Sequence, residues 1–541
     1  MRQKLLFLTL CIICIVSLGI VFRHLQSDNV IKRPTFEIIA TPDLHELGNT
    51  ITEFIYAKQR KDHKYDFRVR YLSSTEILQT LQQEDLLQNP DIVLMPSIEW
   101  LQLSAATRLA LEIKQIMFSP IVVAFNKDKG KPFQDGFHRT LKAEAFFEET
   151  LKGGLKYAFL TPTHHPVGLS TYLGVLKLAE KKGTEKNPLE LRKSLKRFIA
   201  NAAFISPNPL DFRGVFEDPN YDAVIVTERM AARFNKKMRQ EGLIPRDVLY
   251  FTQAPYGISA QLVYLHKGDK ERQKLVRDIK RYLTGKTAQK RLAGAFFRTP
   301  FGKYYDSESW RGLSPLQKAS TRSGLNKFQL NRFLGRYQEF LRKPSYAVFV
   351  LNAEMGLRDS FSAELKEAFA DIAKNEEGKF WLTPKNEDVL HLIVADGGSP
   401  KNSVIEVGDK SKVSDALHLM QKSKVKSKSK GKGLQTDRAD IGAPSGGGRA
   451  ITQALKEVCA VEAKFNRSVI VITDTPITKG DGIQDLIDEY EKCADKISLF
   501  VIRLDNKGSK QEVLPQELKV QREYVDFQNI TSVMENLRGY L

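Results

Sequence analysis

Short apolar runs alternate with amphipathic stretches along the first half of this chain. Residues 36–40 form an apolar run that ends in Thr41-Pro42-Asp43, and an amphipathic segment follows it. Residues 91–95 form another such run, which leads into Pro96-Ser97 and a short predicted helix at 98–103. Strands that alternate with helices in this way predict a parallel α/β sheet.

The same alternation returns between residues 157 and 297. A strand predicted at 157–160 is followed by the loop 161–168, which reads TPTHHPVG, and by a helix predicted at 169–181. Further apolar runs follow, and residues 269–284 have the spacing of an amphipathic helix. This part of the chain therefore predicts a second set of α/β elements.

A third set of elements begins after a basic linker. Residues 325–341 predict an amphipathic helix, which Lys343-Pro344-Ser345 ends because proline disfavours helix in the residue before it. Strands are then predicted near residues 346–351, 389–395, 403–407, 469–473, 497–504 and 523–525. We therefore predict four segments, which are an anchor at 1–30, a first α/β domain at 31–320, a helical linker at 321–345 and a second α/β domain at 346–541.

The first α/β domain resembles the type 2 periplasmic, or extracytoplasmic, solute-binding proteins. The resemblance lies in the order of four pieces of sequence: FEIIATPDLHELGNTITEF, NPDIVLMPSIEWLQ, LKYAFLTPTHHPVGLSTYLG and LVYLHKGDKERQKLVRDIKRYLTGKTAQKRLAGAFFRTP. They look like that family's opening strand and helix, its strand with a ligand-loop Ser, its second-lobe strand and loop, and its closing elements. The resemblance implies two lobes, joined by hinge strands, that close on a ligand.

Loops that lead into helices present free backbone N–H groups, which suit an anion or a carboxylate. The candidate ligand contacts in the first lobe are Thr41, Asp43, Ser97 and Glu99. Those in the second lobe are Thr161, Thr163, His164, Gly168, Ser170 and Thr171, and Tyr256 is expected to border the cleft. The alternative for Thr163 and Ser170 is that they only cap the helix predicted at 169–181.

The adjacent pair His164-His165 has two interpretations. Histidines in a loop ligate Zn²⁺ in many proteins, and they titrate near pH 6.5. No further Cys, His or carboxylate lies at ligand spacing, so a surface or cleft-lining pair is favoured over a metal site. We expect no metal and no cofactor.

The second α/β domain resembles the von Willebrand factor type A domain, an open doubly wound sheet with flanking helices. The resemblance rests on YAVFVLNAEMGLRDS, SGGGRAITQAL and SVIVITDTP, in that order. That family carries Asp-x-Ser-x-Ser after its first strand, a Thr on a Gly-rich loop and an Asp after its fourth strand, and together they form a metal-ion-dependent adhesion site. The matching positions here are Asn352, Glu354, Gly356, Arg449 and Asp474, of which only Asp474 keeps the family's residue.

These substitutions remove the expected metal ligands. Mg²⁺ prefers hard oxygen ligands in octahedral geometry, but Asn352 offers a neutral amide and Gly356 offers no side chain. Arg449 places a permanent cation where the family has a hydroxyl ligand. We predict a degenerate site in which the guanidinium replaces the metal and bridges Asp474, with Glu354 as a second candidate partner. The alternative is that Arg449 points into solvent.

Residues 5–22 carry no charge and follow Arg2 and Lys4. Their length is about the minimum that spans a bilayer, and no small-residue cleavage site follows them. We therefore predict an uncleaved single-pass anchor in the cytoplasmic (inner) membrane. The flanking charges do not fix its orientation. The extracytoplasmic position of the rest of the chain therefore follows only from the resemblance to solute-binding proteins.

Cys459 and Cys493 lie outside this anchor, near the ends of two predicted helices. In a doubly wound sheet, right-handed crossovers place these helices on the same face, so the two thiols are candidates for a disulfide. The alternative is that both cysteines only pack in the core.

The net charge of the chain is +19. Part of it is concentrated in a polar stretch that contains Lys422, Lys424, Lys426, Lys428, Lys430 and Lys432. Such a loop attracts an anionic lipid surface or an acidic partner, or it is only a solvated insertion. Nucleic-acid binding is disfavoured because no aromatic residues alternate with these lysines.

The leading functional hypothesis is a membrane-anchored binding protein that is not an enzyme. Its first domain would bind a small solute or peptide, and its second would dock a partner protein without a metal. The alternative is a structural or assembly scaffold of the cell envelope with no solute. The chain has no Gly-x-Ser-x-Gly, no His-Glu-x-x-His and no phosphate loop ending in Gly-Lys-Ser/Thr, which disfavours the corresponding enzyme classes.

Overall fold

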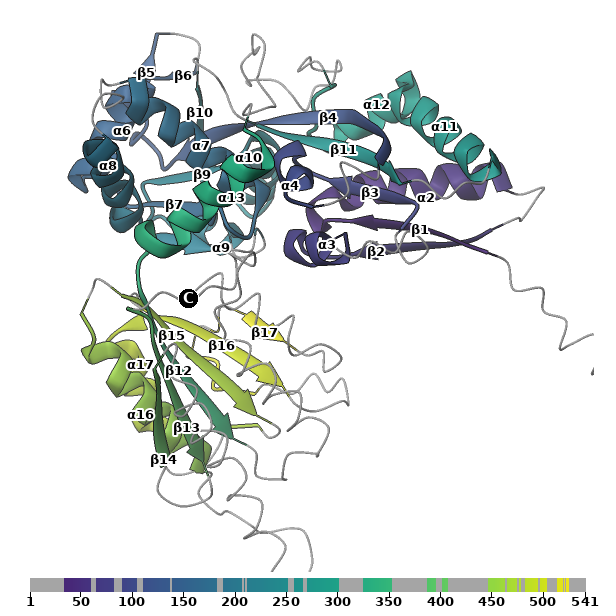
Figure 1. Ribbon diagram of the computed structural model, residues 1–541. Helices are drawn as coiled ribbons and strands as arrows, with labels where there is room; N and C mark the ends of the chain where they lie inside the picture. Colours follow the sequence, from purple (N-terminus) through teal and green to yellow (C-terminus); the bar gives the residue numbers. More distant parts are fainter. Residues whose placement is uncertain are drawn as a thin grey trace, which may run out of the picture.

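The structure is a computed structural model, and it contains two sheets in the part of the chain that it describes (Figure 1). It describes residues 34–524, with gaps at 60–64, 82–89, 105–109, 137–138, 182–187, 207–208, 210–211, 252–256, 266–269, 301–324, 353–386, 396–400, 407–445, 463–464, 474–475, 478–481, 495–496, 504–512, 519 and 521. The larger sheet has 11 strands and the smaller has six.

The first lobe is built on parallel strands with helices between them. Its elements, in chain order, are β1 (Thr35–Ala40), a 3-10 turn (Pro42–Leu44), α2 (His45–Gln59), β2 (Asp66–Tyr71), α3 (Ser74–Thr80), β3 (Ile92–Met95) and α4 (Ile98–Leu103). Strand β1 pairs in parallel with both β2 and β3. The predicted α/β character of this segment is confirmed.

Two long strands connect this lobe to the next one. The first half of β4 (Ala110–Phe125) pairs with β11 (Gly257–Leu265), which also pairs with β3. The second half of β4 pairs with β9 (Ala223–Thr227) and β10 (Asp247–Phe251). Figure 1 shows β4 and β11 running from one lobe to the other. The lobes are therefore joined through a shared strand, as hinge strands would join them.

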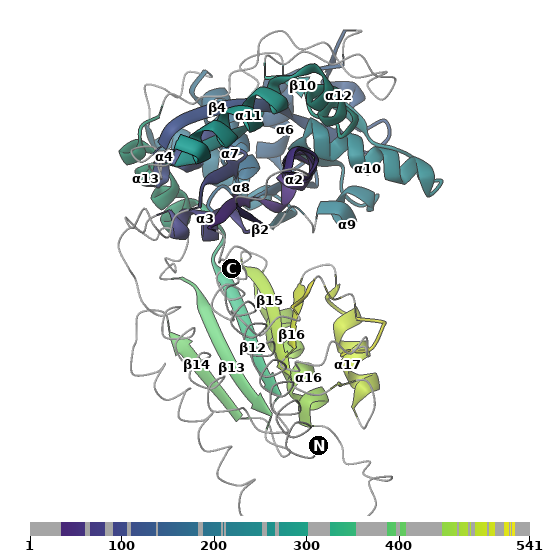
Figure 2. The same ribbon diagram turned by 90° about the vertical axis from the view of Figure 1, so that its right-hand side faces the viewer.

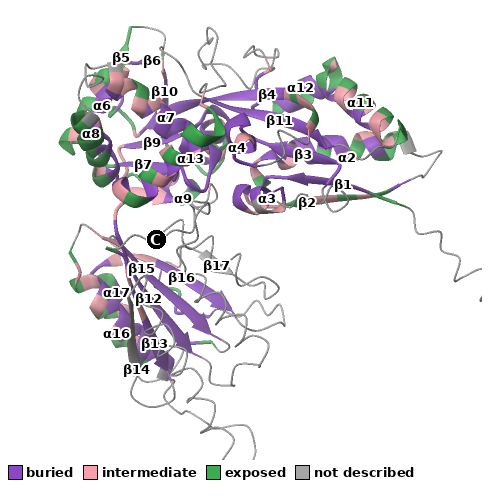
Figure 3. Ribbon diagram, in the orientation of Figure 1, coloured by how far each residue is buried: buried purple, intermediate pink, exposed green. Residues whose placement is uncertain are grey.

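The second lobe packs five helices around the β7–β9 region. Its strands are β5 (Gln134–Asp135), β6 (Thr140–Leu141), β7 (Tyr157–Leu160) and β8 (Phe204–Ser206), together with β9, β10 and half of β4. Its helices are α6 (Ala143–Lys152), α7 (Pro166–Lys181), α8 (Pro188–Asn201), α9 (Phe212–Glu217) and α10 (Glu228–Gln240), and a 3-10 turn covers Lys131–Phe133. Strands β7 and β9 are fully buried, while the helices keep one exposed face (Figure 3).

The chain then returns to the first lobe. Helices α11 (Lys270–Thr284) and α12 (Lys286–Gly294) place Ile279 and Leu292 in one core cluster with Leu47 and Ile51 of α2. The helical hairpin therefore covers the first lobe on the side where α2 lies, because its apolar positions recur at helical spacing.

A second apolar cluster, which we call the junction cluster, contains residues of both lobes. It joins Trp100 and Leu101 of α4 to Leu169 and Leu173 of α7, and all four are at most 4% exposed. Helix α13 (Lys327–Arg336) adds to the same cluster from the linker. An Asn326–Gln329 capping box starts α13, and a π-helical turn at Tyr337–Leu341 ends it. The prediction of a single α-helix over 325–341 is therefore wrong for residues 337–341.

The C-terminal sheet has the strand order β14-β13-β12-β15-β16-β17 (Figure 2). The strands are β12 (Ser345–Asn352), β13 (Val389–Ala395), β14 (Lys401–Glu406), β15 (Asn466–Thr473), β16 (Ser498–Arg503) and β17 (Arg522–Tyr524). All pairs are parallel except β13 with β14. Strands β12, β15 and β16 are buried along most of their length, as expected for a parallel sheet covered on both faces.

Helices α16 (Gly446–Ala460) and α17 (Ile483–Glu491) pack on this sheet through one cluster, which includes Ile451, Leu455 and Leu486. Helix α16 begins at Gly446. The Gly-rich stretch is therefore the first turn of the helix and not a separate loop, because the glycines take helical geometry against the end of β12.

Several sequence predictions lie outside the described residues. They include the membrane anchor at 5–22, the lysine-rich stretch at 422–432 and Tyr256. Among the helices that the structure describes, none has the length and apolar character needed to cross a membrane. The four predicted segment boundaries stay a prediction.

Candidate functional site

An ion-pair cluster connects the first turns of two helices across the lobe junction. Glu46, in the first turn of α2, accepts from the Arg229 guanidinium, and its other oxygen lies 3.2 Å from Arg233 Nη1. Both arginines belong to α10 of the second lobe. Arg229 is 3% exposed, and burial lowers its pKa while the nearby Glu46 raises it. A buried arginine at a helix N-terminus is unfavourable without an anionic partner, and Glu46 supplies one.

Polar atoms near this cluster are buried without a protein partner among the described residues. They are Thr41 Oγ1, Asp43 Oδ1 and Arg229 Nε. Thr41 is only 1% exposed. Buried polar groups in folded proteins are nearly always hydrogen-bonded, so atoms of this kind indicate a bound water or ligand. These three atoms come from both lobes, as the predicted cleft residues should.

The loop before α7 brings a hydrogen-bonded chain to the same junction. The Thr161 and Thr163 hydroxyls lie 3.2 Å apart, and Thr163 Oγ1 lies 2.9 Å from His164 Nδ1. His165 Nδ1 accepts from the Val167 N–H at 3.1 Å, so His165 acts as the N-cap of α7. The loop is thus held by its own hydroxyl and imidazole groups.

Asp43 acts electrostatically on His165 across the junction. Burial lowers the pKa of His165, and the Asp43 carboxylate opposes that shift by raising it. The first turns of α2 and α10 are therefore linked through Glu46, and the 3-10 turn before α2 is linked to the residue that caps α7 through Asp43. N-termini of helices attract negative charge because their N–H groups are unpaired, so this place favours a polar ligand over an apolar one.

Helix α7 begins at Pro166, earlier than the predicted start at 169. Proline suits the first helical position because its missing N–H is not needed there. A side chain at Gly168 would overlap the carbonyl oxygens of Leu160 and Thr161. Gly168 therefore lets α7 approach the end of β7 closely. This packing role explains the glycine without a ligand.

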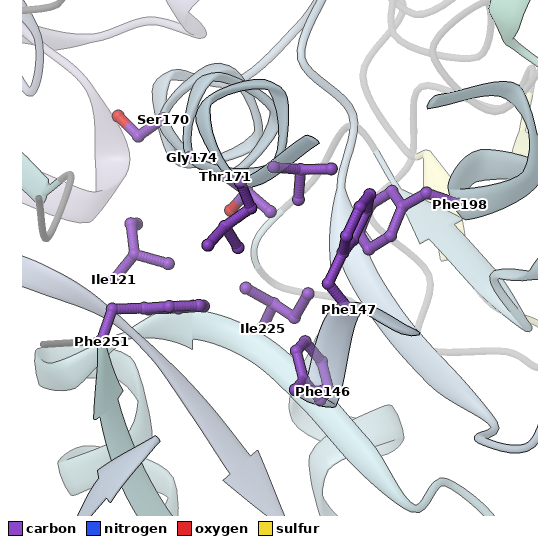
Figure 4. A pocket seen from close by; sticks show the side chains of 11 residues that line it. Ile121, Phe146, Phe147, Ser170, Thr171, Gly174, Phe198, Ile225 and Phe251 are labelled. Atoms are coloured by element: carbon purple, nitrogen blue, oxygen red, sulfur yellow. The ribbon is translucent and has the colours of Figure 1, made fainter. Parts of the chain in front are cut away.

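Ser170 and Thr171 lie inside α7, so the alternative that Ser170 caps this helix is wrong. The Thr171 hydroxyl donates to the Val167 carbonyl oxygen at 2.9 Å. Both residues line a hollow within the second lobe, among Phe146, Phe198 and Ile225 (Figure 4). They therefore face the inside of that lobe.

This hollow is small. It encloses about 460 Å³ when all space between atoms is included, but the space open to the centre of a water molecule is about 30 Å³. One water needs roughly 10–15 Å³ by that measure, so the hollow takes about two waters. It does not have the size of a solute site.

Ser97 and Glu99 satisfy each other at the start of α4. Ser97 Oγ accepts from the backbone N–H groups of Glu99 and Trp100, at 3.1 and 3.4 Å, and donates to Glu99 Oε2 at 2.8 Å. Both side chains are buried, with exposures of 3% and 7%. This geometry is that of a helix N-cap, which accounts for both residues without a ligand.

Glu46, Arg229 and Arg233 were not singled out by the sequence analysis. The available signal was Thr227-Glu228-Arg229, a cap and two charges directly after the buried strand β9. The same arrangement, a strand followed by a cap and an acidic first turn, marked Thr41 and Ser97. Charges in the first turn of an amphipathic helix are usually solvated. The sequence pattern alone therefore does not separate Glu46, Arg229 and Arg233 from ordinary surface residues.

The C-terminal candidate positions are only partly described. Asn352 is fully buried at the end of β12, where its Nδ2 donates to Thr473 Oγ1 at 3.1 Å and its amide packs against Gly447. Arg449 is exposed in the first turn of α16. Glu354, Gly356 and Asp474 lie outside the described residues, so the predicted arginine bridge stays a prediction. In the described ranges, no group of three or more His, Cys, Asp or Glu is placed to hold a metal.

Cys459 of α16 and Cys493, which follows α17, are joined by a disulfide, with their Cα atoms 5.8 Å apart. That separation is ordinary for a bridge. The two helices pack together on one face of the sheet, as right-handed crossovers require.

Comparison with known proteins agrees with the two-lobed architecture. Residues 47–298 match the family model of bacterial extracellular solute-binding proteins. No curated protein matched the chain in sequence. The segment 47–298 is therefore similar to the solute-binding domain of that family.

Three solved structures show how distant the structural likeness is. A periplasmic thiamin binding protein has 12% identity and a TM-score of 0.40, over 56% of this chain and 92% of that chain. Iron-bound HitA from Pseudomonas aeruginosa has 15% identity and a TM-score of 0.39, over 55% and 95%. The substrate binding protein of an ABC transporter from Agrobacterium tumefaciens has 11% identity and a TM-score of 0.41, over 58% and 96%.

Proposed function

We propose that this protein is an extracytoplasmic, non-catalytic binding protein. Its first domain holds a small solute or peptide where the two lobes meet, and its C-terminal domain docks a partner protein without a metal. The family match over residues 47–298 supports the solute-binding part. The disulfide between Cys459 and Cys493 supports an oxidising compartment outside the cytoplasm. A membrane anchor at residues 5–22 would hold the chain at the membrane.

One observation carries the solute proposal. Thr41 Oγ1, Asp43 Oδ1 and Arg229 Nε are buried from two lobes without a protein partner among the described residues. Arg229 Nε is a donor, Asp43 Oδ1 is an acceptor, and the Thr41 hydroxyl is both. The complementary ligand therefore carries an acceptor group and a donor group close together, as an amino acid or a peptide does.

The docking proposal rests on the topology of the C-terminal sheet. Its strand order reverses between β12 and β15, and ligands of open α/β sheets bind at the carboxyl ends of the strands at such a point. Asn352 and Thr473 end these two strands, and the exposed Arg449 follows at the start of α16. In the von Willebrand factor type A family, the adhesion site depends on a metal ion. Because Arg449 stands where that family has a metal ligand, the contact proposed here is independent of metal.

A scaffold without a solute is the second candidate, and one observation favours it. The lobes share an apolar junction cluster. Such packing would serve a fixed structural domain as well as a receptor.

A ligand screen separates the two candidates. The full chain is screened by thermal shift against amino acids, dipeptides, organic acids and thiamin, with and without iron. A compound at about 100 times its dissociation constant should stabilise the protein by about 2.7 kcal/mol. If no compound raises the melting temperature, the scaffold is favoured.

A variant then tests the site. Thr41→Val keeps the volume of the side chain and removes the buried hydroxyl. It should weaken binding of any active compound at least tenfold and leave the ligand-free protein as stable as before. Thr284→Val is the matched control because its hydroxyl bonds to carbonyl oxygens of its own helix. Equal affinities of the two variants would remove Thr41 from the site.

A further inference from the structure

Helix α13 packs against both lobes at once. Leu330 and Leu334 are fully buried in the junction cluster beside Trp100 of α4. Tyr337, in the π-helical turn that follows, belongs instead to the core of the second lobe, and Phe333 between them contacts both clusters. Close-packed interiors do not deform continuously, so a movement of one lobe against the other must repack this helix.

Tyr337 connects this helix to the candidate solute site. Its ring centroid lies 5.4 Å from that of Tyr172 in α7, and the Thr161 side chain acts on its hydroxyl, lowering the pKa that burial raises. Thr161 and Thr163 continue the chain of hydroxyl groups to His164. Burial raises the pKa of Tyr337 to about 12, so its hydroxyl keeps its proton at neutral pH. The loop before α7 is therefore tied to the linker by a side chain that is 2% exposed.

Two consecutive residues of the linker, Arg342 and Lys343, contact different domains. Arg342 Nη1 donates to Asp388 Oδ1 at 2.9 Å, and the Ser345 N–H donates to the same oxygen at 2.9 Å, so Arg342 is fixed to the C-terminal domain. Lys343 Nζ donates to the Ala202 carbonyl oxygen at 3.1 Å, directly after α8 of the second lobe. A cation at a helix C-terminus is favourable. The C-terminal sheet is therefore attached to the second lobe by buried contacts.

We propose that α13 and its π-helical turn transmit the relative position of the two lobes to the C-terminal sheet. Tyr337 is the positioning residue that links the Thr161 loop to the linker. The inference rests on the proposed function, because solute binding is what would move the lobes. When the lobes separate, Leu330 and Leu334 follow the first lobe while Tyr337 follows the second. The resulting strain falls on the π-helical turn, a type of turn that is frequent at functional sites, and reaches β12 through Arg342.

The test uses no solute, so its failure is distinct from the failure of the ligand screen. Hydrogen–deuterium exchange is measured by mass spectrometry on the full chain. Glu46→Gln weakens the ion pairs with Arg229 and Arg233, which hold the lobes together far from α13. We expect exchange to become at least threefold faster in α13 and in β12. Glu53→Gln is the matched control, because it lies on the same helix and pairs with Arg291 within the first lobe.

The double variant Glu46→Gln/Tyr337→Phe tests the route. Phenylalanine keeps the ring contact with Tyr172 and removes the hydroxyl on which the Thr161 side chain acts. We expect β12 to return toward the exchange rate of the wild type. The proposal is overturned if β12 exchanges at the wild-type rate in Glu46→Gln, or if it exchanges equally fast in the single and the double variant.

Discussion

The Glu228 carboxylate and the Arg298 guanidinium form an ion pair with no exposed surface on either side chain. Arg298 Nε donates to Glu228 Oε2 at 2.6 Å, and the Tyr250 hydroxyl donates to Glu228 Oε1 at 2.7 Å. Glu228 begins α10 in the second lobe. Arg298 follows α12 of the first lobe, and its backbone pairs with Phe118 in β4. The ion pair therefore holds the segment that follows α12 against β4, the strand that both lobes share.

Removing one partner of this pair should be strongly destabilising. Glu228→Ala leaves a buried guanidinium without its carboxylate, and such changes cost about 3–5 kcal/mol. Chemical denaturation of the full chain measures the loss. Glu241→Ala is the control, since its contact with Arg213 at 3.4 Å is exposed and should contribute less than about 1 kcal/mol. Similar losses in the two variants would contradict a special role for the buried pair.

Histidine 165 should make the stability of the first domain depend on pH. The pKa of the buried imidazole is lowered from its ordinary value of 6.5. The unfolded chain therefore binds more protons than the folded one as pH falls below about 6.5. This contribution to stability is complete above that pH and is lost as pH falls through the lower pKa of the folded state.

The matched variant is His165→Asn. Asparagine does not titrate, and its side-chain oxygen can still accept from the Val167 N–H at the start of α7. Melting temperatures measured between pH 7.5 and 5 should fall less steeply in this variant than in the wild type. Parallel pH profiles for the two proteins would rule out burial of neutral His165 as the cause.

The disulfide should stabilise only the C-terminal domain. The bridged cysteines are 34 residues apart in sequence, and a loop of that length is worth about 4 kcal/mol. Reduction, or the double variant Cys459→Ser/Cys493→Ser, should lower one calorimetric transition by on the order of 10 °C. The transition of the two-lobed domain should not move. Reductant should have no further effect on the double variant, and a shift of both transitions would argue against this assignment.

The sequence predicted the secondary structure well where strands are buried on both faces. Strands β3 and β7 are continuous apolar runs, and β9 and β12 are apolar except at their ends, because parallel strands covered on both sides need apolar residues along their length. Errors occurred at helix ends. The start of α7 was placed after Gly168 because Pro166 and Gly168 together look like a loop, whereas proline at a first helical position and a glycine in close packing are compatible with helix.

The candidate site was predicted only in part. The sequence selects Thr41, Asp43, Thr161, Thr163 and His164 as candidates because caps and short polar residues after a buried strand mark the carboxyl edge of a sheet. The same rule also selected Ser97 and Glu99, which satisfy each other as a helix cap. The pattern of residue types in the sequence indicates where a polar side chain lies relative to a strand or helix. It does not indicate which polar atoms form hydrogen bonds in the folded protein.

The amino-acid sequence by itself determined the two α/β units, their strands and the position of the cysteines, because hydrophobic periodicity and cap residues act over a few neighbouring positions. Only the tertiary structure decided that Glu46 meets Arg229, that Tyr337 reaches Thr161 and that Arg342 and Lys343 hold different domains. These contacts join residues that are far apart in sequence, and their energies depend on burial and distance, which no local pattern contains.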